Sequence, residues 1–426
     1  MIANTAGWDT DCNSGNVGCL LGIKDGLAGI DAGPDWRGPM ADRLYVVTAE
    51  GGRTVTDAVA ETYEVVASGR ALAGEESLVI KRGARFHFDL PGAVQGFRVD
   101  ERTALWRTAT VENVPGNSAL GRRSLAIRYR LTTGLDAHVA TPTFIPPDAL
   151  DNYYTLLASP TLYPGQTVGA GITADSACIG AATYRLYLTT YDAHDEPIRV
   201  YGPEIATDPG ERTDLSWTIP DTGNQPIGEI GIALRAPGRA DGTLYLDTLT
   251  WDGAPDCTLT RPAAGGSRWR RAWTQGVDHF LDHPDDIFRL VQDQGRGLLI
   301  QGTRDWADYE IQTTVTPHMV TAAGIAVRVQ GMERYYALLL HTTDRAQLVK
   351  ALDGMTILSE IDFPWEFGRS YEMRLRAAGD HLQAWIDGRC IFDLHDGSAS
   401  LRVGGIALVC EEGRMAADEI SVRAIR

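Results

Sequence analysis

The stretch YEIQTTVT at residues 309–316 alternates between two sets of side chains, and this alternation decides the fold class. Every second side chain falls on one face of an extended chain, as in a half-buried β-strand: Tyr309, Ile311, Thr313 and Val315. Similar runs stand between Pro, Gly, Asn and Asp turns: ATYRLYLTTYD (182–192), GIAVRVQG (324–331) and HLQAWIDG (381–388). Short alternating strands between turn residues predict antiparallel β-sandwiches.

Outside the alternating runs, the pattern changes along the chain and suggests four segments. We predict a short all-α N-terminal segment followed by two antiparallel β-sandwich domains of the jelly-roll type. The predicted ranges are 1–75 for the helical part, 78–254 for the first sandwich, 255–267 for a linker and 268–426 for the second sandwich. The linker is inferred from its Pro, Gly and small residues.

Composition excludes several classes of protein. The 426 residues carry a formal net charge of −17, which argues against a nucleic-acid binder that follows phosphates. Only three of the 39 basic residues are lysines, which we read as genomic bias: Lys24, Lys81 and Lys350. The six cysteines form no CxxC pair, so we expect buried thiols and no structural zinc site. The first residues lack the features of a signal peptide, and no apolar stretch could span a bilayer, so we expect a cytoplasmic protein.

The N-terminal 75 residues predict two helices. From Gly15 onward, glycines recur every three or four positions, so they share one stripe of a helix that begins near residue 13. We expect this helix to be buried, with a neighbour packed closely on its glycine side. A second helix is predicted from Thr54 as the capping residue to Gly69 as the stop, with its apolar face on four residues: Val55, Val59, Thr62 and Val66.

The triplet Asp9-Thr10-Asp11 precedes the first helix, and three interpretations compete for it. Aspartates at a helix N-terminus cap orphan amide groups and meet the positive end of the helix dipole. An EF-hand calcium loop is the second interpretation, but Ser14 stands where Gly is needed and Leu20 where the bidentate Glu is needed. The third is a hard-cation site of an enzyme, because two carboxylates before a helix can both turn toward one Mg²⁺.

The stretch GWDTDCNSGNVGCLLG (7–22) resembles the C-terminal metal motif of the ADP-ribosylglycohydrolase family. The segments that follow, up to about residue 75, also resemble bacterial relatives of that family. The resemblance implies an all-helical enzyme with two Mg²⁺ ions, for which Asp9 and Asp11 are metal ligands. Cys12 departs from the usual Thr or Ser, and a thiol is a poor Mg²⁺ ligand. Trp8 replaces a glycine, and we expect its ring to stack on the substrate.

The resemblance also implies further metal ligands, a Glu and a Thr-Asp-Asp run, upstream of the motif. Neither stands before Asp9 in this sequence. We therefore expect a catalyst that is incomplete on its own and a possible upstream polypeptide that completes the helical domain.

The two predicted sandwiches resemble carbohydrate-binding folds. The first, which closes on GTLYLDTLTWDG (242–253), resembles galactose-binding-like jelly rolls, and the second resembles concanavalin A-like or laminin G-like sandwiches. Sugar C–H faces pack on aromatic rings, so candidate platforms in the first sandwich are Tyr153, Tyr154, Tyr191 and Trp217. In the second sandwich, Trp306, Trp365 and Trp385 are notable. Trp385 is opposite in phase to its apolar neighbours, so we expect it to face outward or onto a second layer.

Two hypotheses follow from the sequence. In the first, the chain is the C-terminal part of a Mg²⁺-dependent hydrolase that acts on the glycosidic bond of an ADP-ribosyl or related ribosyl substrate. Its sandwiches would then be accessory carbohydrate-binding domains. In the second, the chain is a non-catalytic carbohydrate- or protein-binding protein made of two β-sandwiches.

Overall fold

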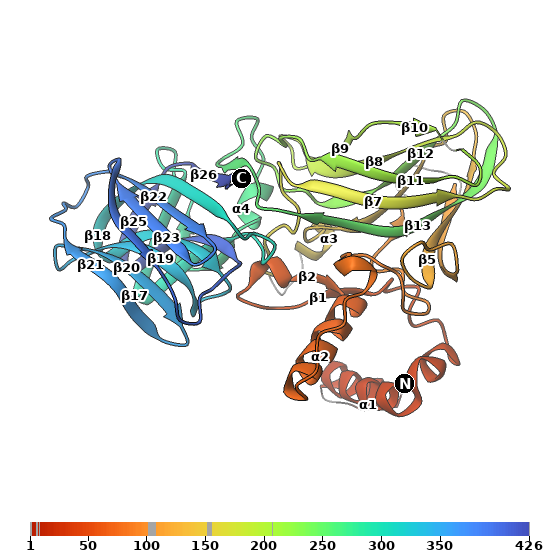
Figure 1. Ribbon diagram of the computed structural model, residues 1–426, viewed down its shortest axis with the longest axis horizontal. Helices are drawn as coiled ribbons and strands as arrows, with labels where there is room; N and C mark the ends of the chain where they lie inside the picture. The colour runs from red at the N-terminus through yellow and green to blue at the C-terminus, as the bar shows by residue number, and fades with distance from the viewer. Residues whose placement is uncertain are drawn as a thin grey trace.

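The computed structural model describes residues 2–5, 7, 9–100, 108–150, 156–206 and 208–425, of which 148 and 150 are described in backbone only. Figure 1 shows a helical N-terminal segment and two β-sandwiches that lie side by side. The predicted fold class, a short helical segment followed by antiparallel sandwiches, is confirmed. None of the helices in these ranges combines the length and apolar character that crossing a bilayer would require.

The N-terminal segment contains two main helices and a short two-stranded ladder. Its elements are η1 (Ala3–Thr5), α1 (Thr10–Asp31), β1 (Arg43–Tyr45), η2 (Gly51–Arg53), β2 (Val55–Asp57), α2 (Ala58–Leu72) and η3 (Lys81–Gly83). The predicted cap of the second helix is wrong: Asp57 is the capping residue, and its side chain accepts hydrogen bonds from the amides of Val59 and Ala60. Val55 instead pairs with Tyr45 in the β1–β2 ladder, because this extended segment ends only at Asp57.

The prediction of a buried, closely packed first helix is also wrong. Helix α1 has no buried residue, and large apolar side chains such as Leu20 and Ile23 are exposed. In the described part of the chain, nothing lies within 4 Å of where a Cβ would stand at Gly15, Gly18 or Gly22. The glycine stripe therefore faces open space.

The first sandwich consists of two antiparallel sheets with one core between them. Its elements are β3 (Arg98–Val99), β4 (Ala109–Pro115), β5 (Arg123–Leu131), β6 (Ala137–Pro142), α3 (Pro147–Leu150), β7 (Thr167–Ala174), β8 (Thr183–Tyr191), β9 (Pro197–Tyr201), β10 (Ile205–Ala206), β11 (Arg212–Thr218), β12 (Glu229–Arg235) and β13 (Ala240–Asp252). One sheet has the order β10-β8-β12-β6-β3, with β9 also paired to β8, and the other has the order β11-β7-β13-β5-β4. Leu186 and Ile232 from the first sheet meet Leu125 and Leu244 from the second in the core.

The second sandwich is built around one long strand. Its elements are β14 (Cys257–Leu259), α4 (Arg268–Arg271), β15 (Thr274–Gly276), β16 (His279–Leu281), β17 (Phe288–Gln301), β18 (Tyr309–Val329), β19 (Arg334–His341), β20 (Arg345–Leu352), β21 (Met355–Asp362), β22 (Tyr371–Ala378), β23 (His381–Ile386), β24 (Arg389–His395), β25 (Gly405–Ala417) and β26 (Ile420–Ala424). The first half of β18 pairs with β22 and β26, and its second half pairs with β19. The first half buries every second side chain, as predicted from YEIQTTVT. Strand β14, which lies in the segment suggested as a linker, pairs with β26.

One layer of the second sandwich curls onto itself. Four strands separate β17 from β21 in the order β17-β25-β18-β19-β20-β21, which would hold them about 24 Å apart in a flat sheet. Yet Nη1 of Arg296 on β17 lies 3.4 Å from Sδ of Met355 on β21. The curl encloses a second cluster of buried side chains, which includes Leu298, Ala337, Leu339 and Val409. The concave face of this layer is therefore filled with side chains.

All six cysteines are free thiols. Only Cys410 is buried, so the expectation of buried thiols is wrong for the exposed Cys12, Cys19 and Cys390. These three lie on the surface helix α1 and the edge strand β24, where the core does not reach.

Candidate functional site

A groove of about 690 Å³ lies over the outer face of the six-stranded sheet in the first sandwich. Strand alternation produces this face: because Leu188 of β8 and Ile230 of β12 point into the core, their neighbours Thr189 and Glu229 point outward. Ala140 of β6 lies in the same outward position and contributes to the floor. The groove has the volume of a typical small-molecule site.

Small residues surround Ala140, which lies on the floor of the groove. Ala140 and Ala233 form a buried cluster with Tyr187 on the outer face. Gly231 lies between the two alanines in the β6–β12 ladder, and a Cβ there would stand 2.1 Å from the carbonyl oxygen of Val139. Only glycine fits this close approach, so no side chain stands opposite Ala140 in this ladder.

The walls come from segments far apart in the sequence. Residues 39–40 and 43–45 of the N-terminal segment form one wall, and residues 98–100 and 146–147 form others. The hydroxyl of Thr189 donates a hydrogen bond to Oε2 of Glu229, 3.0 Å away. The lining carries two arginines, Arg43 and Arg98, and two carboxylates, Asp100 and Glu229, so its formal charges balance. This lining suits a neutral ligand with many hydroxyl groups better than an ion.

Next to the groove, the same face carries aromatic and basic side chains. Nε2 of His138 lies 3.1 Å from the Tyr201 hydroxyl, and the guanidinium of Arg185 lies 3.7 Å from the centre of the Tyr201 ring. Burial, together with the nearby Arg199 charge, lowers the pKa of His138 to about 4. The imidazole is therefore neutral at pH 7. Its Nδ1 atom is buried without a hydrogen-bond partner among the described residues.

The four ring platforms suggested by the sequence have different outcomes. Tyr191 lines the groove, with only 4% of its surface exposed. Trp217 packs against the core and against Gly202, so it is not an open platform. Tyr153 and Tyr154 lie outside the described residues.

The three tryptophans of the second sandwich also differ in burial and contacts. Trp306 is fully buried. The centre of its ring lies 4.9 Å from the centre of the Tyr163 ring, which belongs to the first sandwich. Nε1 of Trp365 donates a hydrogen bond to the carbonyl of His341. Trp385 lies outside the core, on the outer face of its sheet, as its phase predicted.

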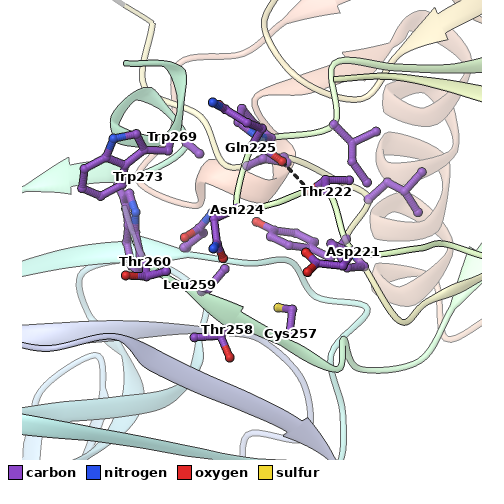
Figure 2. Close-up of a pocket in the computed structure, with 18 residues that line it drawn as sticks. Asp221, Thr222, Asn224, Gln225, Cys257, Thr258, Leu259, Thr260, Trp269 and Trp273 are labelled. Atoms are coloured by element: carbon purple, nitrogen blue, oxygen red, sulfur yellow. Dashed lines mark hydrogen bonds between the residues drawn. The ribbon is translucent and has the colours of Figure 1, made fainter. Parts of the chain in front are cut away.

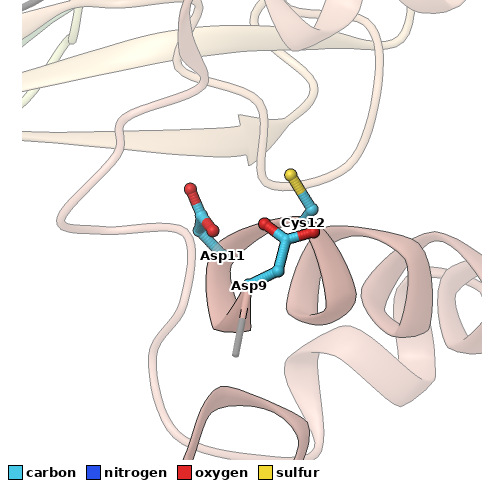
Figure 3. Close-up of side chains that lie close together, drawn as sticks. All are labelled: Asp9, Asp11 and Cys12. Atoms are coloured by element: carbon cyan, nitrogen blue, oxygen red, sulfur yellow. The ribbon is translucent and has the colours of Figure 1, made fainter. Parts of the chain in front are cut away.

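The predicted metal residues lie together at the start of α1. Figure 3 shows Asp9, Asp11 and Cys12 on the same side of the helix end. One ligand atom from each lies within 4.8 Å of the others, and all three residues are exposed. Asp9 occupies the capping position in a left-handed conformation (φ 55°), but its side chain makes no capping hydrogen bond. A hydrogen bond from the thiol to Asp9 and the charges of the two aspartates raise the pKa of Cys12.

This cluster does not form a complete Mg²⁺ site. Mg²⁺ takes about six oxygen ligands, and sulfur is a poor substitute for them. The cluster offers two carboxylates and one thiol, and no further His, Cys, Asp or Glu of the described residues joins it. Trp8, the predicted stacking residue, lies outside the described residues. No catalytic step through a metal follows from these residues alone.

A smaller cavity lies between the two sandwiches. Figure 2 shows Trp269 and Trp273 on one side of it and the strand segment Cys257–Thr260 below. Its volume of about 40 Å³ holds at most a few waters and excludes a sugar ring. The groove of the first sandwich is therefore the better ligand site.

No family model and no curated protein matches the chain. Among solved structures, the chain is similar to the carbohydrate-binding module CBM66 from Bacillus subtilis, with 16% identity, a TM-score of 0.33, and coverage of 35% of this chain and 94% of that one. A Bacillus subtilis protein of unknown function with a galectin-like fold matches with 14% identity, a TM-score of 0.32, and coverage of 41% and 99%. The CBM22-1 xylan-binding domain of Paenibacillus barcinonensis Xyn10C matches with 10% identity, a TM-score of 0.28, and coverage of 39% and 89%. Likenesses this distant carry no inference about the ligand.

Sequence reasoning missed most of the groove. The alternation in β8 and β12 could have identified Thr189 and Glu229 as outward residues. No sequence signal indicated that residues 39–45 would form a wall beside them, because that contact joins segments about 150 residues apart.

Proposed function

We propose that the chain is a carbohydrate-binding protein and that the groove over β6, β12 and β8 holds a neutral oligosaccharide. The observation that carries this proposal is the groove itself, with a volume of about 690 Å³, the small Ala140 on its floor, Tyr45 in its wall and balanced charges. This proposal agrees with the second hypothesis from the sequence.

The lining supplies both kinds of contact that a sugar needs. Sugar hydroxyls donate and accept hydrogen bonds, and Glu229, Asp100 and Arg98 offer acceptors and donors in one groove. The C–H face of a sugar ring packs on an aromatic side chain, and the half-buried Tyr45 lines the groove, whereas Tyr191 exposes too little of its ring for this contact. The ligand is inferred to be neutral, since a net charge of −17 repels acidic glycans.

Titration calorimetry with xylohexaose and cellohexaose, after a screen on a glycan array, tests the proposal. Ala140→Trp fills the groove from its floor and should weaken binding at least about tenfold, or 1.4 kcal/mol. Ser216→Trp is the matched control, because it adds the same bulk to an exposed position of the opposite sheet. An array without any bound glycan, or equal affinity of Ala140→Trp and wild type, would refute the proposal.

A second candidate function is part of an ADP-ribosylglycohydrolase-like enzyme. It is supported by the Asp9–Asp11 cluster, which capping does not occupy, and by an apolar groove of about 580 Å³ along α1, lined by Val17, Leu21 and Trp36. In this proposal a helical polypeptide covers the apolar groove and contributes the missing Mg²⁺ ligands, and the ligand is an ADP-ribosyl group.

A reconstituted enzyme separates the two candidates. A helical partner that carries Thr-Asp-Asp should restore Mg²⁺-dependent release of ADP-ribose, and Asp9→Ala with Asp11→Ala should abolish it while both sandwiches stay folded. Glycan binding without any such release favours the first proposal, and Mg²⁺ affinity unchanged by the double substitution would reject the second.

A further inference from the structure

The outer face of one layer in the second sandwich carries a half-buried tryptophan, Trp385, among polar side chains. The layer is formed by β24, β23, β22 and the first half of β18. Leu382, Ala384 and Ile386 of β23 point into the core, which leaves His381, Gln383 and Trp385 on the outer face. The indole of Trp385 therefore lies outside the core.

The neighbours of Trp385 are fixed by strand register. Arg374 of β22 pairs with Trp385, and Arg376 pairs with Gln383. On the far side of β22, the same two arginines pair with Gln312 and Glu310 of β18. The outward positions on the β22 and β18 side of the ring therefore hold arginine, glutamine or carboxylate side chains, and on the β24 side Trp385 pairs with the exposed Cys390.

Part of this polar surface is already held in place. Nε2 of Gln383 donates to Asp393 at 2.9 Å, and Nε2 of His381 lies 2.6 Å from the same carboxylate. These contacts order donors and acceptors next to the ring before any ligand arrives, which lowers the entropy cost of binding.

The two arginines are held more loosely. The guanidinium of Arg374 lies 3.9 Å from the centre of the Trp385 ring, and its ion pair with Glu310 spans 3.7 Å. The side chain of Arg376 makes no hydrogen bond and no ion pair with any described residue. Both side chains can turn to an incoming hydroxyl group, and the turn of Arg374 uncovers the ring.

We propose that this face is a second carbohydrate-binding surface, specific for extended neutral polysaccharide chains. The indole takes the C–H face of one sugar residue, and Arg376, Gln383 and Arg374 bond to hydroxyls of adjacent residues. A sheet face without walls accepts the middle of a long chain, whereas the groove of the first sandwich encloses a short one. The proposal uses residues of the other sandwich, so it stands or falls separately from the groove.

Two sites on one chain have a measurable consequence. When both engage the same polysaccharide, the second contact forms at a high effective concentration, so the full chain binds more tightly than either site alone. Removing either site should therefore weaken polysaccharide binding, while only the groove should matter for a hexasaccharide.

Affinity electrophoresis of the full chain tests the proposal. A protein with a pI near 4.9 migrates freely in a native gel at pH 8, and the gels contain hydroxyethylcellulose, soluble xylan or glucomannan. Trp385→Ala should reduce the retardation at least about tenfold, and Trp385→Phe should keep part of it because a ring remains. Trp36→Ala is the control, since Trp36 is a 57% exposed ring in the helical segment.

Two of the variants distinguish the proposed surface around Trp385 from the groove of the first sandwich. Trp385→Ala should leave hexasaccharide binding in solution unchanged, whereas Ala140→Trp should remove it. Wild-type retardation of Trp385→Ala in all three gels, or no retardation of the wild-type protein in any of them, would overturn the second surface. Circular dichroism confirms that the variants are folded. Should Trp385→Ala fail to fold, the retardation of Trp385→Phe and Arg376→Ala decides the question: reduction supports the proposal and wild-type behaviour overturns it.

Discussion

The two sandwiches differ in whether a sheet face with alanines is open or covered. In the first, Ala140 lies on the floor of an open groove, next to the buried cluster that it forms with Ala233 and Tyr187. In the second, Ala337 and Ala407 lie on a concave face that the curl of the sheet closes and fills. The same residue type thus lines an open groove in one unit and a closed core in the other. Sheet curvature, rather than composition, decides between them.

The two sandwiches also share a feature, a buried lysine–aspartate pair. Nζ of Lys81 lies 2.7 Å from Oδ1 of Asp247 in the first, and Nζ of Lys350 lies 2.6 Å from Oδ2 of Asp396 in the second. These are two of the only three lysines in a chain whose other basic residues are arginines. A compact ammonium with three donors fits where a planar guanidinium does not. This geometry accounts for the lysines at positions 81 and 350.

The largest predicted effect tests that shared feature. Lys81→Met removes one of the two cationic partners of the fully buried Asp247 carboxylate, which keeps Arg212, and should cost about 3 kcal/mol in the free energy of unfolding. Lys350→Met should cost less, because both members of its pair are slightly exposed. Lys24→Met, in exposed α1, is the matched control and should cost nothing measurable. Urea denaturation of the three variants gives the ranking, and equal costs for all three would contradict the account.

The next prediction concerns acid and separates the two sandwiches. Burial and the nearby Lys81 charge lower the pKa of His87 from 6.5 to about 4, and burial with Arg199 does the same for His138. A depressed pKa gives the folded state stability above pH 6.5, which is lost as the pH falls toward 4. Each histidine then contributes about 3 kcal/mol by proton linkage.

The histidines of the second sandwich are half-buried or exposed, so its stability should change less over the same range. Calorimetric scans between pH 7 and 4 should show the first sandwich losing stability faster. His87→Gln with His138→Gln should flatten that dependence. Parallel loss of stability in both units would contradict the assignment.

Overpacking sharpens the contrast between the open and the closed face. Ala337→Trp forces a large ring into the curled layer and should cost about 1–3 kcal/mol. Ala140→Trp adds the same ring at the groove floor, where the ring can extend into the groove, and should cost less than Ala337→Trp. Thermal denaturation compares the two, and a larger loss for Ala140→Trp would show that the groove is not open.

The smallest effect is predicted for the helical segment. Deletion of residues 2–31 removes no buried side chain of α1, so both sandwich transitions should keep their midpoints within error. The same deletion should reduce binding of an apolar fluorescent probe, since it removes exposed residues such as Leu20 and Ile23. A lowered midpoint would show that α1 supports the sandwiches.

The sequence predicted what depends on local periodicity. The burial of Tyr309, Ile311, Thr313 and Val315 and the outward position of Trp385 both follow from alternation along one strand. The same reasoning failed at Thr54, where the chain stays extended in the β1–β2 ladder until Asp57 caps the helix. The ladder depends on pairing with residues 43–45, which no local pattern encodes.

The candidate site could be predicted only in part. Tyr191 was identified as a ring, but its place in a groove depends on walls from residues 39–45 and 98–100. The curl of the second sandwich depends on the combined twist of six strands. The Arg296–Met355 contact could therefore not be predicted from the sequence.

Titration of xylohexaose into the wild-type chain and into Ala140→Trp, with Ser216→Trp as control, tests the central claim most directly. The account predicts heat of binding for the wild type and the control, and a loss of at least about tenfold in affinity for the filled groove. Unchanged affinity of Ala140→Trp for a glycan that the wild type binds would contradict it.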